Sequence, residues 1–164
     1  MISLTLDTKN CMTELLLRDT FDHFLFIEGE ITTFNKFSID GYIQKEFYGT
    51  DETGTVSEET HSTWDKLRDF CFSIIKGKRT PLNFRFIFSL SKDEISSLIT
   101  GRQLDFQPET VQGLYLNFRY DGSVLTCTTG TSLNTFTMDK SLEHAFDKWT
   151  GEFFSAHGIN WNPL

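Results

Sequence analysis

A change of hydrophobic period within residues 64–90 is the feature that most restricts what this chain can fold into. The first part has apolar side chains at helical spacing, at Trp64, Leu67, Phe70, Cys71 and Ile74. The second part has them at every second position, at Leu82, Phe84, Phe86, Phe88 and Leu90. A period near 3.6 is typical of an amphipathic helix, and a period of two is typical of a half-buried strand. The sequence therefore predicts a helix that is followed closely by a strand.

Residues that favour helix ends set the expected limits of this helix. Ser62 and Asp65 have the spacing of a capping box at its start. Gly77 and Pro81 follow its last apolar position and are expected to end it. Similar signals predict three more helices, after Asp7, after the Ser91–Glu94 capping box and after Asp139.

Strand-like alternation recurs on both sides of the central stretch. The expected strands are residues 2–6, a two- or three-stranded meander within 24–48, 113–120 and 123–129, with 134–138 as a candidate further strand. Asp40–Gly41 and Asp121–Gly122 are expected as hairpin turns. We therefore predict an α+β fold, a mostly antiparallel sheet covered by helices, in a single domain of residues 1–164. For the tail after Gly158, packing and fraying are both open.

The aromatic content of the chain predicts one packed core. The chain has 164 residues, with seventeen Phe and three Pro, and a domain of this size buries about two thirds of its unfolded surface. The predicted members of the core are Trp64, Phe70, Ile74, Phe84, Phe86, Phe88, Phe146 and Trp149. Such a composition predicts order throughout the chain.

Three pairs of segments suggest an internal duplication. FSIDGYI at residues 37–43 matches FRYDGSV at 118–124, a displacement of 81 residues. WDKLRDFCF at residues 64–72 matches FDKWTGEFF at 146–154, a displacement of 82. A third pair places Leu6 on Leu90. Either a β-α-β-β-α unit is repeated, as pseudo-repeats 1–81 and 82–164, or Asp-Gly turns and amphipathic helices recur by chance.

The positive charge of the chain is concentrated in one stretch. The net charge is −8, but residues 64–85 hold six of the fifteen bases and only two of the twenty-three acids, a local charge of +4. Lys76, Lys78 and Arg79 follow the predicted helix, and Arg85 lies in the predicted strand. These four residues are the candidates for binding an anionic ligand or an acidic partner. The alternative is that bases at a helix C-terminus only complement the helix dipole.

No group of residues predicts catalysis, a metal site or a cofactor. Ser73 and Lys76 have the S-x-x-K spacing of serine β-lactamases, but the accompanying S-D-N and K-T-G motifs are missing. The four histidines share no spacing that is typical of metal ligands. We therefore expect no catalytic residue, no metal and no cofactor.

The remaining composition limits compartment and partners. Residues 46–59 carry five acids and no base and are expected to form a surface loop. Three distant cysteines argue against a disulfide framework and for a reducing compartment. The sequence has no signal-peptide pattern and no long apolar run, so we expect a cytoplasmic protein without a membrane partner. The acidic charge argues against nucleic acid as a partner.

The sequence resembles known proteins in two ways. The segments FCFSIIKGKRTPL, ITTFN and LTCTTGTSL resemble members of an uncharacterised bacterial family, defined only as a domain of unknown function. This resemblance covers most of the chain and implies no activity, cofactor or catalytic residue. The doubled strand-helix-strand-strand unit is similar in topology to the repeat of sliding DNA clamps. However, the helices at 8–18 and 92–100 that would line a DNA channel mix acids with bases.

The sequence therefore favours a non-catalytic binding or protein-interaction module in the cytoplasm. The expected partners are another protein, a second copy of the chain, or an anionic ligand at Lys76, Lys78, Arg79 and Arg85. Two alternatives stay open. One is an enzyme that acts on a phosphorylated or carboxylated small substrate, and the other is a clamp-like protein associated with nucleic acid.

Overall fold

The computed structural model describes residues 1–49 and 59–164, and this part of the chain contains seven strands and four α-helices. The strands are β1 (Ser3–Leu6), β2 (Leu25–Thr32), β3 (Lys36–Asp40), β4 (Asn83–Ser89), β5 (Val111–Tyr120), β6 (Leu125–Leu133) and β7 (Trp161–Pro163). The helices are α1 (Thr8–Leu16), α2 (Trp64–Ile75), α3 (Lys92–Gly101) and α4 (Ser141–Ala156). Two short 3-10 helices are η1 (Lys45–Tyr48) and η2 (Pro108–Thr110).

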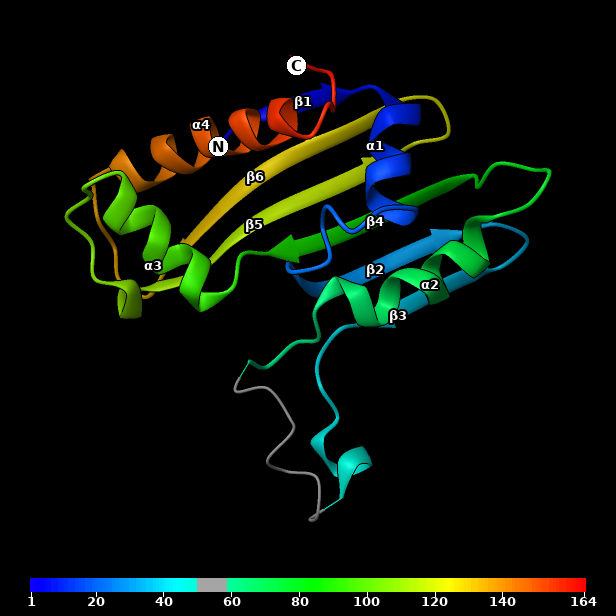
Figure 1. The fold of residues 1–164 in the computed structure, drawn as a ribbon, viewed down its shortest axis with the longest axis horizontal. Coiled ribbons are helices and arrows are strands. Elements are labelled where there is room, and N and C mark those ends of the chain that lie inside the picture. Colours follow the sequence, from blue (N-terminus) through cyan, green and yellow to red (C-terminus); the bar gives the residue numbers. More distant parts are fainter. Residues whose placement is uncertain (50–58) are drawn as a thin grey trace.

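All seven strands belong to one antiparallel sheet, in the order β3-β2-β4-β5-β6-β1-β7. Helices α1, α2 and α4 lie across one face of this sheet, and α3 lies beside the end at which β4 finishes (Figure 1). This arrangement confirms the predicted α+β fold. We call the other side of the sheet, to which the odd-numbered residues of β4 point, the open face.

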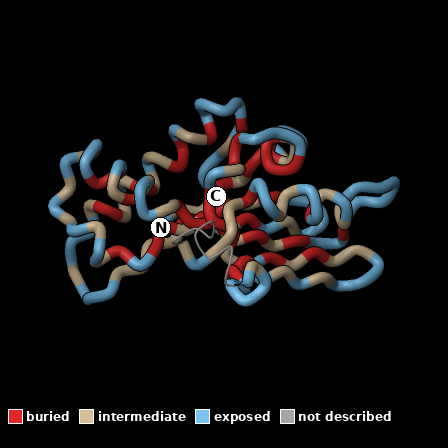
Figure 2. The backbone as a smooth tube through the Cα atoms, turned by 60° about the horizontal axis from the view of Figure 1, so that its bottom comes forward, coloured by how far each residue is buried: buried red, intermediate tan, exposed pale blue. Residues whose placement is uncertain are grey.

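The central helix and strand form as the period change predicts. The even positions of β4 are buried beneath the helices, with exposed fractions of 3% for Phe84 and 0% for Phe86 and Phe88. Trp64, the first residue of α2, packs edge-to-face on Phe88 with ring centroids 5.0 Å apart. Its indole N–H donates to the Leu15 carbonyl oxygen at 2.8 Å, so the buried donor is satisfied. Buried and less buried residues alternate along the strands (Figure 2).

Two predictions about apolar positions are wrong. Phe70, expected in the core, is 68% exposed, and Leu82, expected on the buried face of the strand, is 64% exposed. The stripe of α2 that contacts the sheet contains Trp64 and Cys71, which are both fully buried. Phe70 is one position, about 100° of helix rotation, away from Cys71 and falls outside this stripe. The other predicted core residues are buried or pack partly buried against the core.

The expected helix caps form at α1 and α3 and not at α2 and α4; the N-cap residue of α4 is Lys140 and not the expected Asp139. Asp7 accepts a hydrogen bond from the Asn10 backbone N–H at 2.9 Å and caps α1. The reciprocal capping box of Ser91 and Glu94 forms at the start of α3. The Ser62 capping box is wrong, because Thr63 is the N-cap residue of α2. The Ser62 backbone instead forms hydrogen bonds with the backbones of Phe26 and Gly41, so it is tied to the sheet.

The expected turn at Asp40–Gly41 is also wrong. Residues 33–35 form the loop between β2 and β3, because Thr32 lies opposite Lys36 and Glu28 lies opposite Asp40. The Asp40 carboxylate accepts the Tyr42 backbone N–H at 2.9 Å, a local contact that ends β3 and does not reverse it. The turn at Asp121–Gly122 is confirmed, because it joins the paired strands β5 and β6.

The strand pairing does not repeat between the two halves of the chain. In the second half β4 pairs with β5, but β1 and β3, which the displacements of 84 and 81 residues place on β4 and β5, are not neighbours. β1 pairs with β6 and β7, and β2 pairs with β3 and β4. The turns at 40–41 and 121–122 also differ in role. The sheet therefore does not confirm a duplication of residues 1–81 in 82–164.

The acidic loop, residues 134–138 and the C-terminal tail are the remaining segments for which the sequence made predictions. Most of the expected acidic loop lies at residues 50–58, outside the described residues, and η1 precedes it. Residues 134–138 form no strand, whereas the tail packs as β7 against β1. In the described part of the chain, no helix combines the length and the apolar character that are needed to cross a membrane.

Candidate functional site

The connection between α2 and β4 exposes the predicted cations. α2 ends one residue before Lys76, whose backbone is already extended, with φ −63° and ψ 145°. Gly77 follows with φ 149°, a conformation that residues with side chains rarely adopt. The Leu82 backbone N–H donates to the Thr32 carbonyl oxygen at 2.9 Å and ties the end of the connection to β2. Residues 78–80 between these two points are exposed.

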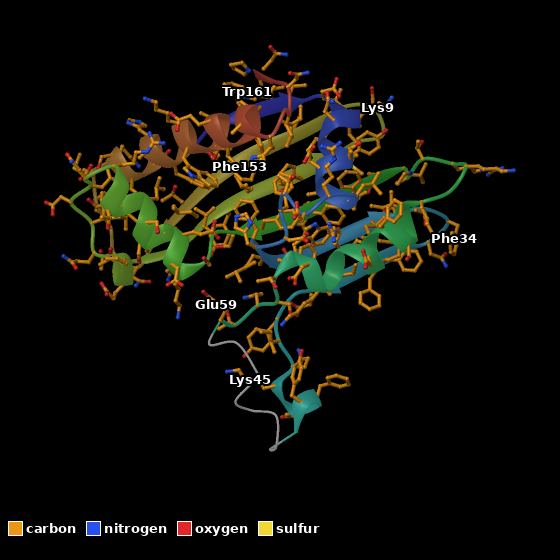
Figure 3. All side chains as sticks on the ribbon, viewed as in Figure 1. Lys9, Phe34, Lys45, Glu59, Phe153 and Trp161 are labelled. Carbon is orange, nitrogen blue, oxygen red and sulfur yellow. The ribbon has the colours of Figure 1, made fainter. Side chains whose placement is uncertain are left out.

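A hollow of about 510 Å³ lies beside this connection. It is formed by the last turn of α2, the connection itself and the loop between β2 and β3. Its described lining residues are Thr33, Phe34, Ile74, Ile75, Lys76, Gly77, Lys78, Arg79, Thr80 and Leu82. Phe34 is 85% exposed and lies on the loop between β2 and β3 (Figure 3). We call residues 76–82 together with Phe34 the basic corner.

The structure places three of the four candidate residues at the basic corner. Lys76, Lys78 and Arg79 line the hollow and are all exposed. Within residues 1–49 and 59–164, none of the three forms an ion pair. Their charges are therefore compensated only by solvent and salt in this part of the chain.

Arg85, the fourth candidate, is not part of this group. It occupies an odd position of β4 and points to the open face. Its guanidinium lies 3.3 Å from a carboxylate oxygen of Glu28 and 3.9 Å from one of Glu30. Arg68 on α2 is likewise paired, 3.4 Å from Asp22. Arg68 and Arg85, one on each side of the basic corner in sequence, are thus paired with carboxylates, in contrast to the three bases at the corner.

The basic corner combines cations with exposed apolar side chains. Its described lining includes no Asp, Glu, His or Cys side chain, and the only hydroxyl groups belong to Thr33 and Thr80. Lysine and arginine side chains beside exposed apolar groups match a ligand that carries both negative charge and apolar surface.

A second cavity of about 520 Å³ lies at the opposite end of β2 and β4. The start of β2, the end of β4, the first turn of α3, η2 and residues 59–61 enclose it. Its polar lining includes His61, Lys92 and Tyr115. The Lys92 backbone N–H donates to the Glu59 carboxylate at 3.2 Å, which joins residue 59 to the start of α3. The His61 ring packs edge-to-face with Tyr42, with centroids 5.7 Å apart.

Sequence reasoning missed this second cavity because its residues come from four separate segments of the chain, 25–27, 59–61, 89–96 and 108–115. One local signal was present, the pair of glycines at Gly113 and Gly130 within strands. A Cβ atom on Gly113 would lie 2.4 Å from the Tyr115 ring, and Gly130 faces the Cβ of Tyr115 at 3.7 Å. The ring therefore occupies space that only glycine leaves free.

The other reactive side chains are structural. Burial raises the pKa of the Cys71 thiol to about 12 and also raises the pKa of Cys11 and Cys127. These three thiols are therefore protonated at neutral pH and poor nucleophiles. His23 forms an ion pair with Glu94, with the ring nitrogen 3.2 Å from the carboxylate oxygen. In the described part of the chain, no three His, Cys, Asp or Glu side chains are grouped so that they could hold a metal ion.

Comparison with known proteins gives one match. A family model described as a family of unknown function, DUF5721, matches residues 14–162. The chain therefore belongs to this family, as the resemblance seen in the sequence implied. No curated protein and no solved structure gives a match. The topological likeness to sliding clamps thus stays a prediction.

Proposed function

We propose that this member of the DUF5721 family is a non-catalytic binding module that holds an acidic protein segment at the basic corner. The observation that supports this proposal is the contrast in charge pairing. Lys76, Lys78 and Arg79 have no ion-pair partner in the described part of the chain, whereas Arg68 and Arg85 on either side are paired.

The concentration of charge gives the proposal its physical basis. The chain has a net charge of −8, so a polyanion is repelled by most of its surface. Three exposed cations within four residues create a local positive potential that reaches about one Debye length, roughly 8 Å at physiological salt. A partner that carries several carboxylates in a short stretch would be oriented towards this corner and away from the rest of the molecule.

The apolar residues of the corner add a second requirement for the partner. Phe34 and Leu82 are 85% and 64% exposed, and burial of apolar surface contributes about 25 cal/mol per Å². An acidic segment with an interspersed aromatic or aliphatic side chain can gain both the electrostatic attraction and the burial of apolar surface. Such a partner would bind more tightly than an acidic segment without apolar side chains.

The test compares two triple variants with equal loss of charge. K76Q/K78Q/R79Q removes the cations of the basic corner, and K9Q/K45Q/K148Q removes three exposed lysines elsewhere. Fluorescence anisotropy with a labelled peptide of alternating Glu and Phe measures binding at about 50 and 200 mM salt. We expect the first triple variant to lose binding and the second to keep it. Equal affinities for the two variants would refute the proposal.

A second candidate function is binding of a small molecule in the second cavity. Its volume of about 520 Å³ is within the range of small-molecule sites, which is roughly 300–1,000 Å³. Lys92 supplies a cation, Glu59 and Glu109 supply carboxylates, and His61 and Tyr115 supply hydrogen-bonding groups. A thermal-shift screen of small metabolites against the wild type and K92Q tests it, since a ligand that contacts Lys92 stabilises the wild type more than the variant.

A further inference from the structure

The outer edge of β3 has no strand beside it in the described part of the chain. β3 is the first strand of the sheet, and its partner β2 lies on one side only. The Gly41 backbone N–H donates to the Ile27 carbonyl oxygen at 2.9 Å. Because backbone direction alternates along an antiparallel strand, residues 37 and 39 also direct their backbone groups to β2. The backbone groups of Lys36, Ser38 and Asp40 therefore face outwards.

This edge has few of the features by which proteins block strand addition. Protected edges are very short or carry bulges, prolines or charged side chains, and of these β3 has the charges of Lys36 and Asp40, with Lys36 already 3.5 Å from Glu30 of its own chain. The register of β3 with β2 is continuous over five residues, from Lys36 to Asp40, and β3 contains no proline. The opposite edge is different, because β7 has only three residues and includes Pro163. Unpaired donors and acceptors on β3 can thus accept another strand.

The sequence of β3 is complementary to itself in the antiparallel direction. A pairing centred on Ser38 places Lys36 of each copy opposite Asp40 of the other, on the open face. It also places Phe37 opposite Ile39, on the face that α2 covers. Opposite charges and apolar side chains in directly opposed positions stabilise an antiparallel pair. Both kinds of contact occur twice, since the two copies are related by a two-fold axis.

α2 carries a further apolar side chain towards this edge. The Arg68 guanidinium pairs with Asp22, in the connection that follows α1, so this side of α2 faces α1. Phe70 lies about 200° around the helix from Arg68 and points away from α1, towards the side of β3. It is 68% exposed, and Phe37 and Ile39 beneath are only half-buried. A second copy on β3 would cover these side chains.

We propose that two copies of this chain pair through their β3 strands, with Ser38 on the two-fold axis, and join their sheets into one. This interface goes beyond the proposed function, and it adjoins the basic corner, because the Phe37 ring packs edge-to-face on Phe34 with ring centroids 5.8 Å apart. Because the strands run antiparallel, the two loops that carry Phe34 lie at opposite ends of the paired strands. A dimer would therefore present two separate basic corners.

The charge pair provides the sharpest test. K36D places like charges opposite each other in its own dimer, and so does D40K. In an equimolar mixture, one variant carries carboxylates at both positions and the other carries ammonium groups at both, so opposite charges face each other throughout. Sedimentation velocity over a concentration series should show a wild-type dimer and about tenfold or more weaker association of each variant alone. The mixture should form a heterodimer.

Two further variants separate pairing from folding. S38P removes an outward N–H, which an edge strand tolerates, and should give a monomer with the circular dichroism spectrum of the wild type. K9D changes charge on α1 by the same amount as K36D and should remain dimeric. A wild type that is monomeric at about 100 μM protein would overturn the proposal. So would a mixture of K36D and D40K that associates no better than either variant alone.

Discussion

β4 and the basic corner adjoin in sequence and have opposite surroundings. Phe86 in β4 is fully buried, whereas Leu82, four residues earlier, is 64% exposed. The same alternation of apolar residues runs through both. β4 is flanked by β2 and β5, but Leu82 precedes the first paired residue of the strand, Asn83. The pattern thus identifies the strand, and only the neighbouring elements decide where burial stops.

The largest expected effect is on the β4 side of this comparison. Phe86→Ala should lower the free energy of unfolding by about 3–5 kcal/mol, because it leaves a cavity beneath α2. Leu82→Ala is the matched control and should change stability by about 0.5 kcal/mol or less, since its side chain is mostly exposed. Urea denaturation of both variants measures the difference. Similar losses for the two variants would show that the corner packs as tightly as the strand.

The fold could be predicted from sequence where the signal is local. The period change, the Ser91–Glu94 capping box and the Asp121–Gly122 turn each depend on a few consecutive residues, and each is present in the structure. The prediction for Asp40–Gly41 is wrong because a competing local contact, from Asp40 to the Tyr42 N–H, ends the strand there. Side-chain identity alone does not distinguish these two outcomes.

The residues of the candidate sites could likewise be predicted only where they lie close together in sequence. Lys76, Lys78 and Arg79 were found because they are consecutive or nearly so in sequence. Arg85 was grouped with them by sequence distance, but strand alternation turns it to the other face. The second cavity was missed because its walls come from segments that only the sheet order brings together. Pairing across the sheet, as between β1 and β6, is a long-range property that no short pattern encodes.

An intermediate effect is expected where β4 ends and α3 begins. The Ser91 hydroxyl accepts the Glu94 backbone N–H at 3.2 Å, so Ser91→Ala should cost about 1 kcal/mol of stability. Ser97→Ala, at an exposed position of α3, is the control and should be neutral or slightly stabilising, because alanine favours helix. Thermal denaturation compares the two variants. Equal melting temperatures for the two variants would show that the Ser91 cap does not contribute to stability.

A smaller effect, dependent on pH, is expected at the same helix start. The hydrogen bond to Glu94 raises the pKa of His23, although partial burial opposes the shift. The ion pair therefore contributes its full stability below the unfolded-state pKa of 6.5, and loses it as pH rises through the higher folded-state pKa. The stability difference between wild type and His23→Gln should be larger at about pH 5.5 than at about pH 8.

The smallest expected effect on stability belongs to the basic corner. Only Lys76 adjoins the last turn of α2, and the interaction of a cation with the helix dipole is about 0.3–1 kcal/mol and falls off within one turn. K76Q/K78Q/R79Q should therefore change the free energy of unfolding by about 0.5 kcal/mol or less. Urea denaturation at low salt and at about 1 M salt measures this change, because added salt screens exposed charges. A larger loss in the free energy of unfolding at low salt, absent at high salt, would mean that the three cations stabilise α2. In that case the basic corner and β4 would differ only in exposure. The three cations would then stabilise the helix, and the proposal that they bind a partner would lose its support.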